Sequence, residues 1–260
     1  MATLRDIHAV LARHFPPPLI ESWDSSGVIC GDWQAQVEKV LLTVDITSNI
    51  LDEARAVGAQ CIVSHHPLLL PRHSIAAEPW KFRLVARANA LNIALVNAHT
   101  NADNARPGVT DALCEVLGLE ETDALIATDM DAATGTGRIG NLSTPMSLEQ
   151  LMRLIQTVVP GGRPRTNGAL DDFIRRVAVC AGAGDEFLAE VRRTDADVYI
   201  TSDLRHHPVL EHVEAGGCTL IDIEHSAAEA LWLPQVAAIL SAEAGMAVSL
   251  SQVRTAAWSD

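Results

Sequence analysis

The chain has 260 residues, enough for one large or two small domains, and 48% of them are hydrophobic, as in ordinary globular proteins. Its 19 lysines and arginines against 33 aspartates and glutamates give a formal net charge of −14 at pH 7, which argues against nucleic-acid binding as the main role. No apolar run approaches the ~20 residues needed to cross a bilayer, so we expect no membrane partner.

The five cysteines are scattered along the chain and form no C-x-x-C pair. This pattern favours reduced, buried thiols over disulfides or a zinc ribbon, and it therefore predicts a cytoplasmic protein. The first residues predict an amphipathic helix rather than a signal peptide, which agrees with that location.

Helices and strands alternate in the first half of the chain. Apolar residues at helical spacing predict a helix over 3–14, and Pro16-Pro17-Pro18 end it. The pattern then predicts strand 40–44, a helix that begins at Thr47 or Ser48 and ends at Gly58, strand 60–64, helix 79–91, strand 93–97 and helix 108–117.

The small and polar residues 129–137 are the best candidate for a linker, which would divide the chain into a first half over 1–128 and a second over 138–260. The second half continues the alternation, with predicted strands at 140–142, 177–181, 197–201, 218–223 and 246–251, and predicted helices at 147–159, 185–193, 208–215 and 225–243. Such alternation predicts an α/β protein with helices packed on mixed, largely parallel sheets.

Two short motifs occur twice, in the same order. His-His-Pro follows a predicted strand at residues 65–67 and again, after a short turn, at residues 206–208. A histidine with an acidic residue four positions later follows the next strand each time, as His99 with Asp103 and as His225 with Glu229. Chance matches are possible for motifs this short, but two ordered matches favour a duplicated chain with two related α/β halves.

Ligand-type side chains gather at the predicted strand ends. Pro67 ends the strand over 61–64, so the adjacent His65 and His66 can face one site at the carboxyl edge of a sheet. His225 and Glu229 lie one helical turn apart on one face, and Asp103 follows His99 in the equivalent turn.

Mixed imidazole and carboxylate ligation suits zinc, iron, manganese or nickel, and five ligands suit two divalent cations better than one tetrahedral zinc. Each residue also has an ordinary structural interpretation. Asp103 could cap the helix near 108, His225 could be a core histidine, and Glu229 could be a solvated helix carboxylate.

The chain resembles the GTP cyclohydrolase I type 2 homologues, also called the Nif-three-like dinuclear metal proteins, over nearly its whole length. The motifs that carry this resemblance are Trp23-Asp-Ser-Ser-Gly27, Ser64-His-His-Pro-Leu68, His99-Thr-Asn-Ala-Asp103, Gly108-Val-Thr-Asp111, Ala181-Gly-Ala-Gly184, Thr201-Ser-Asp-Leu-Arg-His-His207 and His225-Ser-Ala-Ala-Glu229. The resemblance implies two intertwined halves, a toroidal homohexamer and two divalent metals per subunit. It assigns one metal to His66 and Asp103, the other to His65 and His225, and the bridging position to Glu229.

Glu224, Ser226 and Ser202 depart from the family pattern, which puts the shape of the substrate pocket in doubt but not the metal ligands. We expect a metal-dependent hydrolase that acts on a nucleotide or phosphoester-like small molecule, with His99 or His207 moving protons. The alternative is a non-catalytic metal-binding or regulatory scaffold that forms a ring. The sequence leaves the metal, the substrate and the choice between these two functions open.

Overall fold

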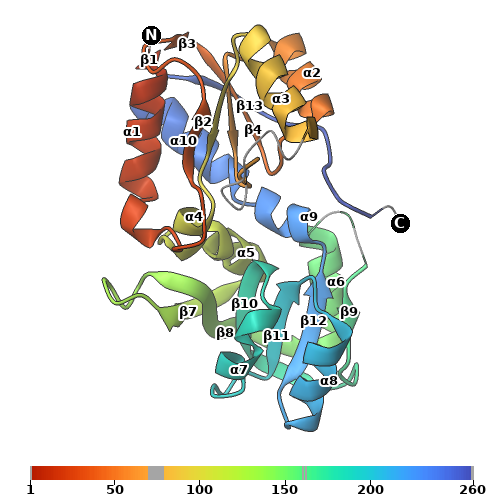
Figure 1. Ribbon diagram of the computed structural model, residues 1–260. Helices are drawn as coiled ribbons and strands as arrows, with labels where there is room; N and C mark the ends of the chain where they lie inside the picture. Colours follow the sequence, from red (N-terminus) through yellow and green to blue (C-terminus); the bar gives the residue numbers. More distant parts are fainter. Residues whose placement is uncertain (1, 70–78, 160, 162, 259–260) are drawn as a thin grey trace. The chain divides into compact units, whose positions relative to one another are not determined.

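The computed structural model describes residues 2–69, 79–159, 161 and 163–258, and the chain divides into two compact units (Figure 1). Unit 1 comprises Met1–Ala105 and Leu233–Thr255, and unit 2 comprises Arg106–Trp232 and Ala256–Asp260. The chain therefore leaves unit 1 after residue 105 and re-enters it at residue 233. The units are intertwined in sequence for this reason.

Unit 1 contains a five-stranded sheet in which every neighbouring pair but one is parallel. The strand order is β13 (Ala247–Leu250), β4 (Lys39–Thr43), β5 (Cys61–Ser64), β6 (Ala94–Asn97) and β2 (Gly27–Cys30), with β2 antiparallel to β6. The described part of unit 1 also holds a short antiparallel ribbon of β1 (Ala2–Thr3) and β3 (Gln36–Val37). Leu41, Ile62 and Leu95 lie at the same register, so their side chains form one apolar row across the sheet.

Helices cover both faces of this sheet. The row of Leu41, Ile62 and Leu95 packs against α2 (Ser48–Val57) and α3 (Pro79–Ala90), while α1 (Leu4–His14) and α10 (Leu233–Ala244) lie on the other side (Figure 1). Thr47 caps α2 and Gly58 ends it at φ 72°, as the sequence predicts. The described part of unit 1 also contains η1 (Pro17–Leu19) and α4 (Thr100–Asn104).

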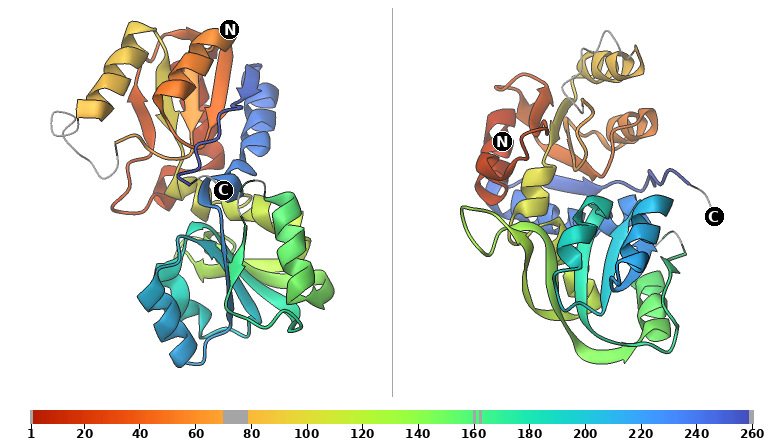
Figure 2. Two further views of the ribbon diagram at one scale, coloured as in Figure 1. Left: turned by 90° about the vertical axis from the view of Figure 1, so that its right-hand side faces the viewer. Right: turned by 60° about the horizontal axis from the view of Figure 1, so that its bottom comes forward.

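Unit 2 contains a six-stranded sheet with a parallel centre and antiparallel edges. Its order is β7 (Leu119–Ala127), β8 (Gly135–Ser147), β10 (Phe173–Ala183), β11 (Val198–Ser202), β12 (Thr219–Ile223) and β9 (Arg165–Thr166). Only the β10–β11 and β11–β12 pairs are parallel. One face carries η2 (Asp185–Phe187), α7 (Leu188–Val191) and α8 (His206–Glu214), and α6 (Leu148–Val158) lies on the other side (Figure 2, left). Next to α6 lies α5 (Val109–Leu117), and α9 (His225–Ala230) contacts α5.

These sheets confirm the predicted α/β class with helices on mixed sheets. Both units contain three consecutive parallel strands followed by an antiparallel neighbour, β4-β5-β6-β2 in one and β10-β11-β12-β9 in the other. This common order is what a duplication predicts. Within the described ranges, no helix is long and apolar enough to cross a membrane.

The structure corrects two predictions. Residues 129–137 are not a linker, because they contain the turn of the antiparallel β7–β8 hairpin, and the units divide at 105/106 and 232/233 instead. The predicted helix over 225–243 is two helices in different units. Pro234 has no backbone N–H to continue α9, so the chain starts a new helix there. The segment between the predicted strand 60–64 and the predicted helix 79–91 falls mainly outside the described residues.

Candidate metal centre

In unit 1, the candidate ligands follow two neighbouring parallel strands. His65 and His66 come directly after β5, and His99 and Asp103 lie just beyond β6. Carboxyl ends of adjacent parallel strands meet at the same edge of a sheet, which is where open α/β sheets bind ligands.

A tight turn after β5 directs both histidines into this edge. The backbone N–H of His66 still donates to the Val44 carbonyl at 2.9 Å, and the Ser64 hydroxyl donates to the His66 carbonyl at 2.8 Å. His65 is fully buried, whereas the His66 side chain is 24% exposed.

The structure gathers three imidazoles at this edge. Ligand atoms of His65, His66 and His99 all lie within 4.8 Å of one another, so this group could hold a metal ion. Asp103 lies on α4, and its Oδ1 is 3.5 Å from Nε2 of His65. Asp103 does not cap α5, because Gly108 is the N-cap residue there and its N–H donates to the Asp111 carboxylate at 2.8 Å.

Every one of these histidines has its Nδ1 atom in a hydrogen bond with an oxygen. Nδ1 of His65 donates to the Ala98 carbonyl at 3.0 Å, and Nδ1 of His66 donates to Asp45 at 2.7 Å. Nδ1 of His99 donates to Asp24 at 2.9 Å. Such bonds fix the tautomer and leave Nε2 as the nitrogen that binds a cation or accepts a proton.

Asp24 accepts several hydrogen bonds besides the one from His99. Its Oδ2 accepts hydrogen bonds from the Thr100 hydroxyl at 2.6 Å and from the Ser26 hydroxyl at 3.0 Å. Burial opposes ionisation, but the hydrogen bonds from His99 and Thr100 outweigh it and hold the pKa of Asp24 well below its ordinary value. Asp24 is therefore a fixed anion that orients the His99 ring.

In unit 2, His225 and Glu229 form a close pair at the carboxyl end of β12. Nε2 of His225 lies 2.9 Å from Oε1 of Glu229, as the spacing of four residues on one helix predicts. Nδ1 of His225 donates to Asp203 at 2.7 Å. Glu229 is buried rather than solvated, which removes the ordinary structural interpretation of this carboxylate.

Gly182, near the end of β10, makes room for the Glu229 carboxylate. Its φ is +78°, and a Cβ atom there would lie 2.5 Å from Oε1 of Glu229. Glu224 accepts a hydrogen bond from the Ala227 N–H and so caps α9.

The charge on His225 is set by its neighbours. Burial lowers its pKa, but the carboxylates of Glu229 and Asp203 have the larger combined effect and raise it to about 11. A cation that binds this imidazole must displace the proton.

Sequence reasoning missed the three aspartates that hold these imidazoles, Asp24, Asp45 and Asp203. A signal was present, because Asp45 and Asp203 each closely follow a strand and Asp24 lies in a quoted motif. His207 lies exposed on the first turn of α8, where its ring packs edge-on against that of His206. Its role in proton transfer stays a prediction.

Known proteins share both the sequence and the fold. The family model Duf34/NIF3 (NGG1p interacting factor 3) matches residues 2–257. The chain is 36% identical over 237 residues to a GTP cyclohydrolase 1 type 2 homolog of Streptomyces coelicolor, covering 89% of this chain and 83% of that protein. It is 31% identical over 242 residues to NIF3-like protein 1 of Drosophila melanogaster, covering 89% and 79%.

Solved structures agree on the fold. A Bacillus cereus protein related to NIF3 superposes with a TM-score of 0.90 at 22% identity, over 99% of this chain and 98% of that chain. Reduced HcgD from Methanocaldococcus jannaschii has a TM-score of 0.81 at 24% identity, over 97% and 98%.

The fold and the histidine-rich strand ends define an α/β protein with side chains that could hold a metal ion. The chain belongs to the Duf34/NIF3 family, because the family model covers nearly all of it and curated relatives exceed 30% identity. The predicted family relationship is confirmed.

Proposed function

We propose that the protein binds two divalent cations and hydrolyses a nucleotide or phosphoester-like small molecule with them. His66 and Asp103 would hold one cation, His65 and His225 the other, and Glu229 would bridge the two. The donor set fits borderline cations such as Zn, Fe, Mn or Ni, because it combines imidazoles with carboxylates.

One observation carries this proposal. All three proposed histidine ligands have Nδ1 hydrogen-bonded to an oxygen, at 2.7 Å for His66 and His225 and at 3.0 Å for His65. An oxygen acceptor at Nδ1 is the usual outer-shell partner of a metal-binding histidine. Histidines that only pack in the core do not need an oxygen acceptor at Nδ1, so three such hydrogen bonds favour metal ligands over core histidines.

Within this chain, His99 is best placed to move a proton. Asp24 holds its Nδ1, which leaves Nε2 to accept a proton from a nucleophile at the cluster. The cations, when bound, would supply positive charge that stabilises the attacking and leaving oxygens of hydrolysis.

The substrate class rests on the relatives and on charge. Several relatives are named GTP cyclohydrolase 1 type 2 homolog, which favours a nucleotide. With a net charge of −14, the chain would need the cations to attract such an anionic substrate. The family resemblance also supports a homohexameric ring, for which light scattering should give the mass of six chains.

The alternative is a metal-binding scaffold without catalysis. It keeps the same ligands and the ring but assigns no chemistry to His99 or His207. Metal-loaded protein that hydrolyses nothing in a broad nucleotide and phosphoester screen would favour the scaffold.

Elemental analysis of protein purified without added metal tests the cation sites first. We expect about two equivalents per chain for the native protein and less than one for Glu229→Ala, because the bridge is lost. Glu243→Ala is the matched control, since Glu243 also contacts a histidine, His14, but at an exposed position. Equal metal content in all three proteins contradicts the proposed ligand set.

The role of His99 is tested with His99→Gln and Asp24→Asn. Both should keep the metal content of the native protein and lower kcat about 100-fold or more, because general base catalysis contributes about 10²- to 10⁴-fold. A parallel loss of metal in His99→Gln would instead make His99 a ligand, which its place in the three-imidazole group also permits.

A further inference from the structure

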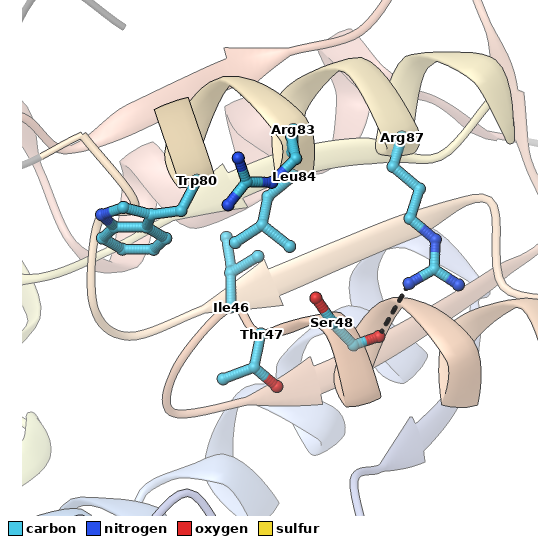
Figure 3. A pocket seen from close by; sticks show the side chains of 7 residues that line it. All are labelled: Ile46, Thr47, Ser48, Trp80, Arg83, Leu84 and Arg87. Carbon is cyan, nitrogen blue, oxygen red and sulfur yellow. Dashed lines mark hydrogen bonds between the residues drawn. The ribbon is translucent and has the colours of Figure 1, made fainter. Parts of the chain in front are cut away.

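Unit 1 contains a second candidate binding site, and none of the proposed metal ligands contributes to it. A pocket of about 450 Å³ lies between α3 and the start of α2, which is within the size range of small-molecule sites. Trp80, Arg83 and Leu84 project from α3 toward Ile46, Thr47 and Ser48 on the facing segment (Figure 3).

Two arginines and no acidic residue line the pocket, in an acidic protein. Helix α3 carries Lys81, Arg83 and Arg87 and no acidic residue, whereas the whole chain has a net charge of −14. Arg87 is already engaged, because it donates to the Ser48 carbonyl at 3.3 Å and pairs with Asp52. Arg83 is exposed and forms no hydrogen bond or ion pair with the described residues. Its guanidinium is therefore available to an anion.

The Trp80 ring also lines the pocket, and Nζ of Lys81 lies 5.3 Å from the ring centroid. The Trp80 side chain is 46% exposed at the pocket rim, and the Arg83 guanidinium points toward it (Figure 3). Leu84 and Ile46 form the apolar floor, and both are buried. The first turn of α2 adds the partial positive charge of a helix N-terminus.

We propose that this pocket binds a small aromatic anion, a planar ring that carries a phosphate or carboxylate group. The ring stacks on Trp80, and the anionic group pairs with Arg83 and faces the first turn of α2. This inference does not depend on the proposed hydrolase, because no residue of the pocket is a candidate metal ligand. The two features are nevertheless neighbours in sequence, since Asp45, which holds His66, directly precedes Ile46.

Calorimetric titration of the EDTA-treated full chain with adenosine 5′-monophosphate tests the proposal at physiological salt. We expect a dissociation constant below about 1 mM. Adenosine alone and inorganic phosphate alone should each bind at least tenfold more weakly, because each offers only half of the recognised chemistry. No detectable binding of the monophosphate overturns the proposal.

Two variants assign the binding to the pocket. Arg83→Gln and Trp80→Leu should each weaken binding about tenfold or more, since a charged hydrogen bond and a stacked ring each contribute at that level. Both side chains are exposed, so circular dichroism should show native folding. Arg55→Gln is the matched control, because Arg55 is an exposed arginine on α2 outside the pocket and forms no ion pair with any described residue.

Each possible result either supports or overturns the proposed binding site. Binding that survives both pocket variants, or that falls equally in Arg55→Gln, overturns the pocket as the site. Phosphate that binds as tightly as the monophosphate, with no effect of Trp80→Leu, overturns the aromatic part. Selective loss in the two pocket variants supports the proposal.

Discussion

At the residue scale, the orientation of the candidate ligands depends on a few neighbouring atoms. Oxygen atoms of Asp24, Asp45 and Asp203 hold the Nδ1 atoms of three histidines, and the absence of a Cβ atom at Gly182 leaves space for Glu229. Asp45, Asp203 and Gly182 orient proposed ligands without being candidate ligands themselves, so their substitution should change metal affinity more than it changes folding.

Gly182→Ala should lower metal affinity about tenfold or more, because the new Cβ would lie 2.5 Å from Oε1 of Glu229 and displace the carboxylate. Gly216→Ala is the control, since Gly216 has a similar φ of +72° but nothing within 4 Å. Both variants should lose about 1 kcal/mol of stability from the left-handed backbone. Calorimetric titration with Mn²⁺ or Zn²⁺ and urea unfolding measure the two effects, and equal metal affinity in the two variants would contradict the prediction.

His212 should make the stability of the protein depend on pH. Burial lowers the pKa of this ring below 6.5, although its hydrogen bond to the Cys218 carbonyl partly opposes the shift. The unfolded chain therefore binds a proton at His212 more readily than the folded chain does. The stability that neutral His212 contributes is present above about pH 6.5 and is lost as the pH falls below it.

Urea unfolding between pH 8 and pH 5 should consequently show a shallower loss of stability for His212→Gln than for the native protein. The difference for one proton is at most about 1.4 kcal/mol per pH unit. His206→Gln, an exposed histidine on the same helix, should follow the native curve. Parallel curves for His212→Gln and the native protein would rule out this role.

At the scale of elements, the positions of the helices depend on a few buried polar links. Arg138 of β8 is fully buried and makes two hydrogen bonds to Asp111 of α5, at 2.8 and 2.7 Å. It also donates to the carbonyls of Gly135 and Gly137, at 2.7 and 2.8 Å. This side chain therefore joins α5 to the β7–β8 hairpin.

Arg138→Ala should cost about 3 to 5 kcal/mol in the free energy of unfolding, because it leaves a mostly buried carboxylate without its partner. Arg153→Ala removes an exposed pair with Glu149 on α6 and should cost less than about 1 kcal/mol. Urea unfolding of both variants measures the contrast. A small loss for Arg138→Ala would show that the hairpin keeps its place without this link.

For the whole molecule, the proposed ligands lie far apart in the sequence, between His65 and Asp103 and between His225 and Glu229, so bound cations should stabilise both segments. At a free metal concentration of 100 times Kd, the added stability is about 2.7 kcal/mol. Hydrogen exchange with and without Mn²⁺ should show added protection near His65 in unit 1 and in α9 of unit 2. Glu229→Ala should lose this protection, and protection confined to one of the two segments would contradict the proposed ligand set.

The sequence by itself determined the local features. Helix caps such as Thr47, the strand ends before His65 and His99, and the pairing of His225 with Glu229 depend on residues a few positions apart, so spacing alone predicts them. The α/β class follows from the alternation of such elements.

Only the tertiary structure decided which side chains meet. His66 and Asp45 are 21 residues apart, and His99 and Asp24 are 75 apart, so their contacts depend on the order of strands in the sheet. The turn over 129–137 and the helix break before Pro234 also depend on the tertiary structure. The polar pattern of the first segment fits a linker as well as a turn, and the helical pattern of the second fits one helix as well as two. Long-range contacts decide between these alternatives. The β7–β8 pairing forms the hairpin, and the passage of the chain from unit 2 into unit 1 divides the helix, and local spacing specifies neither.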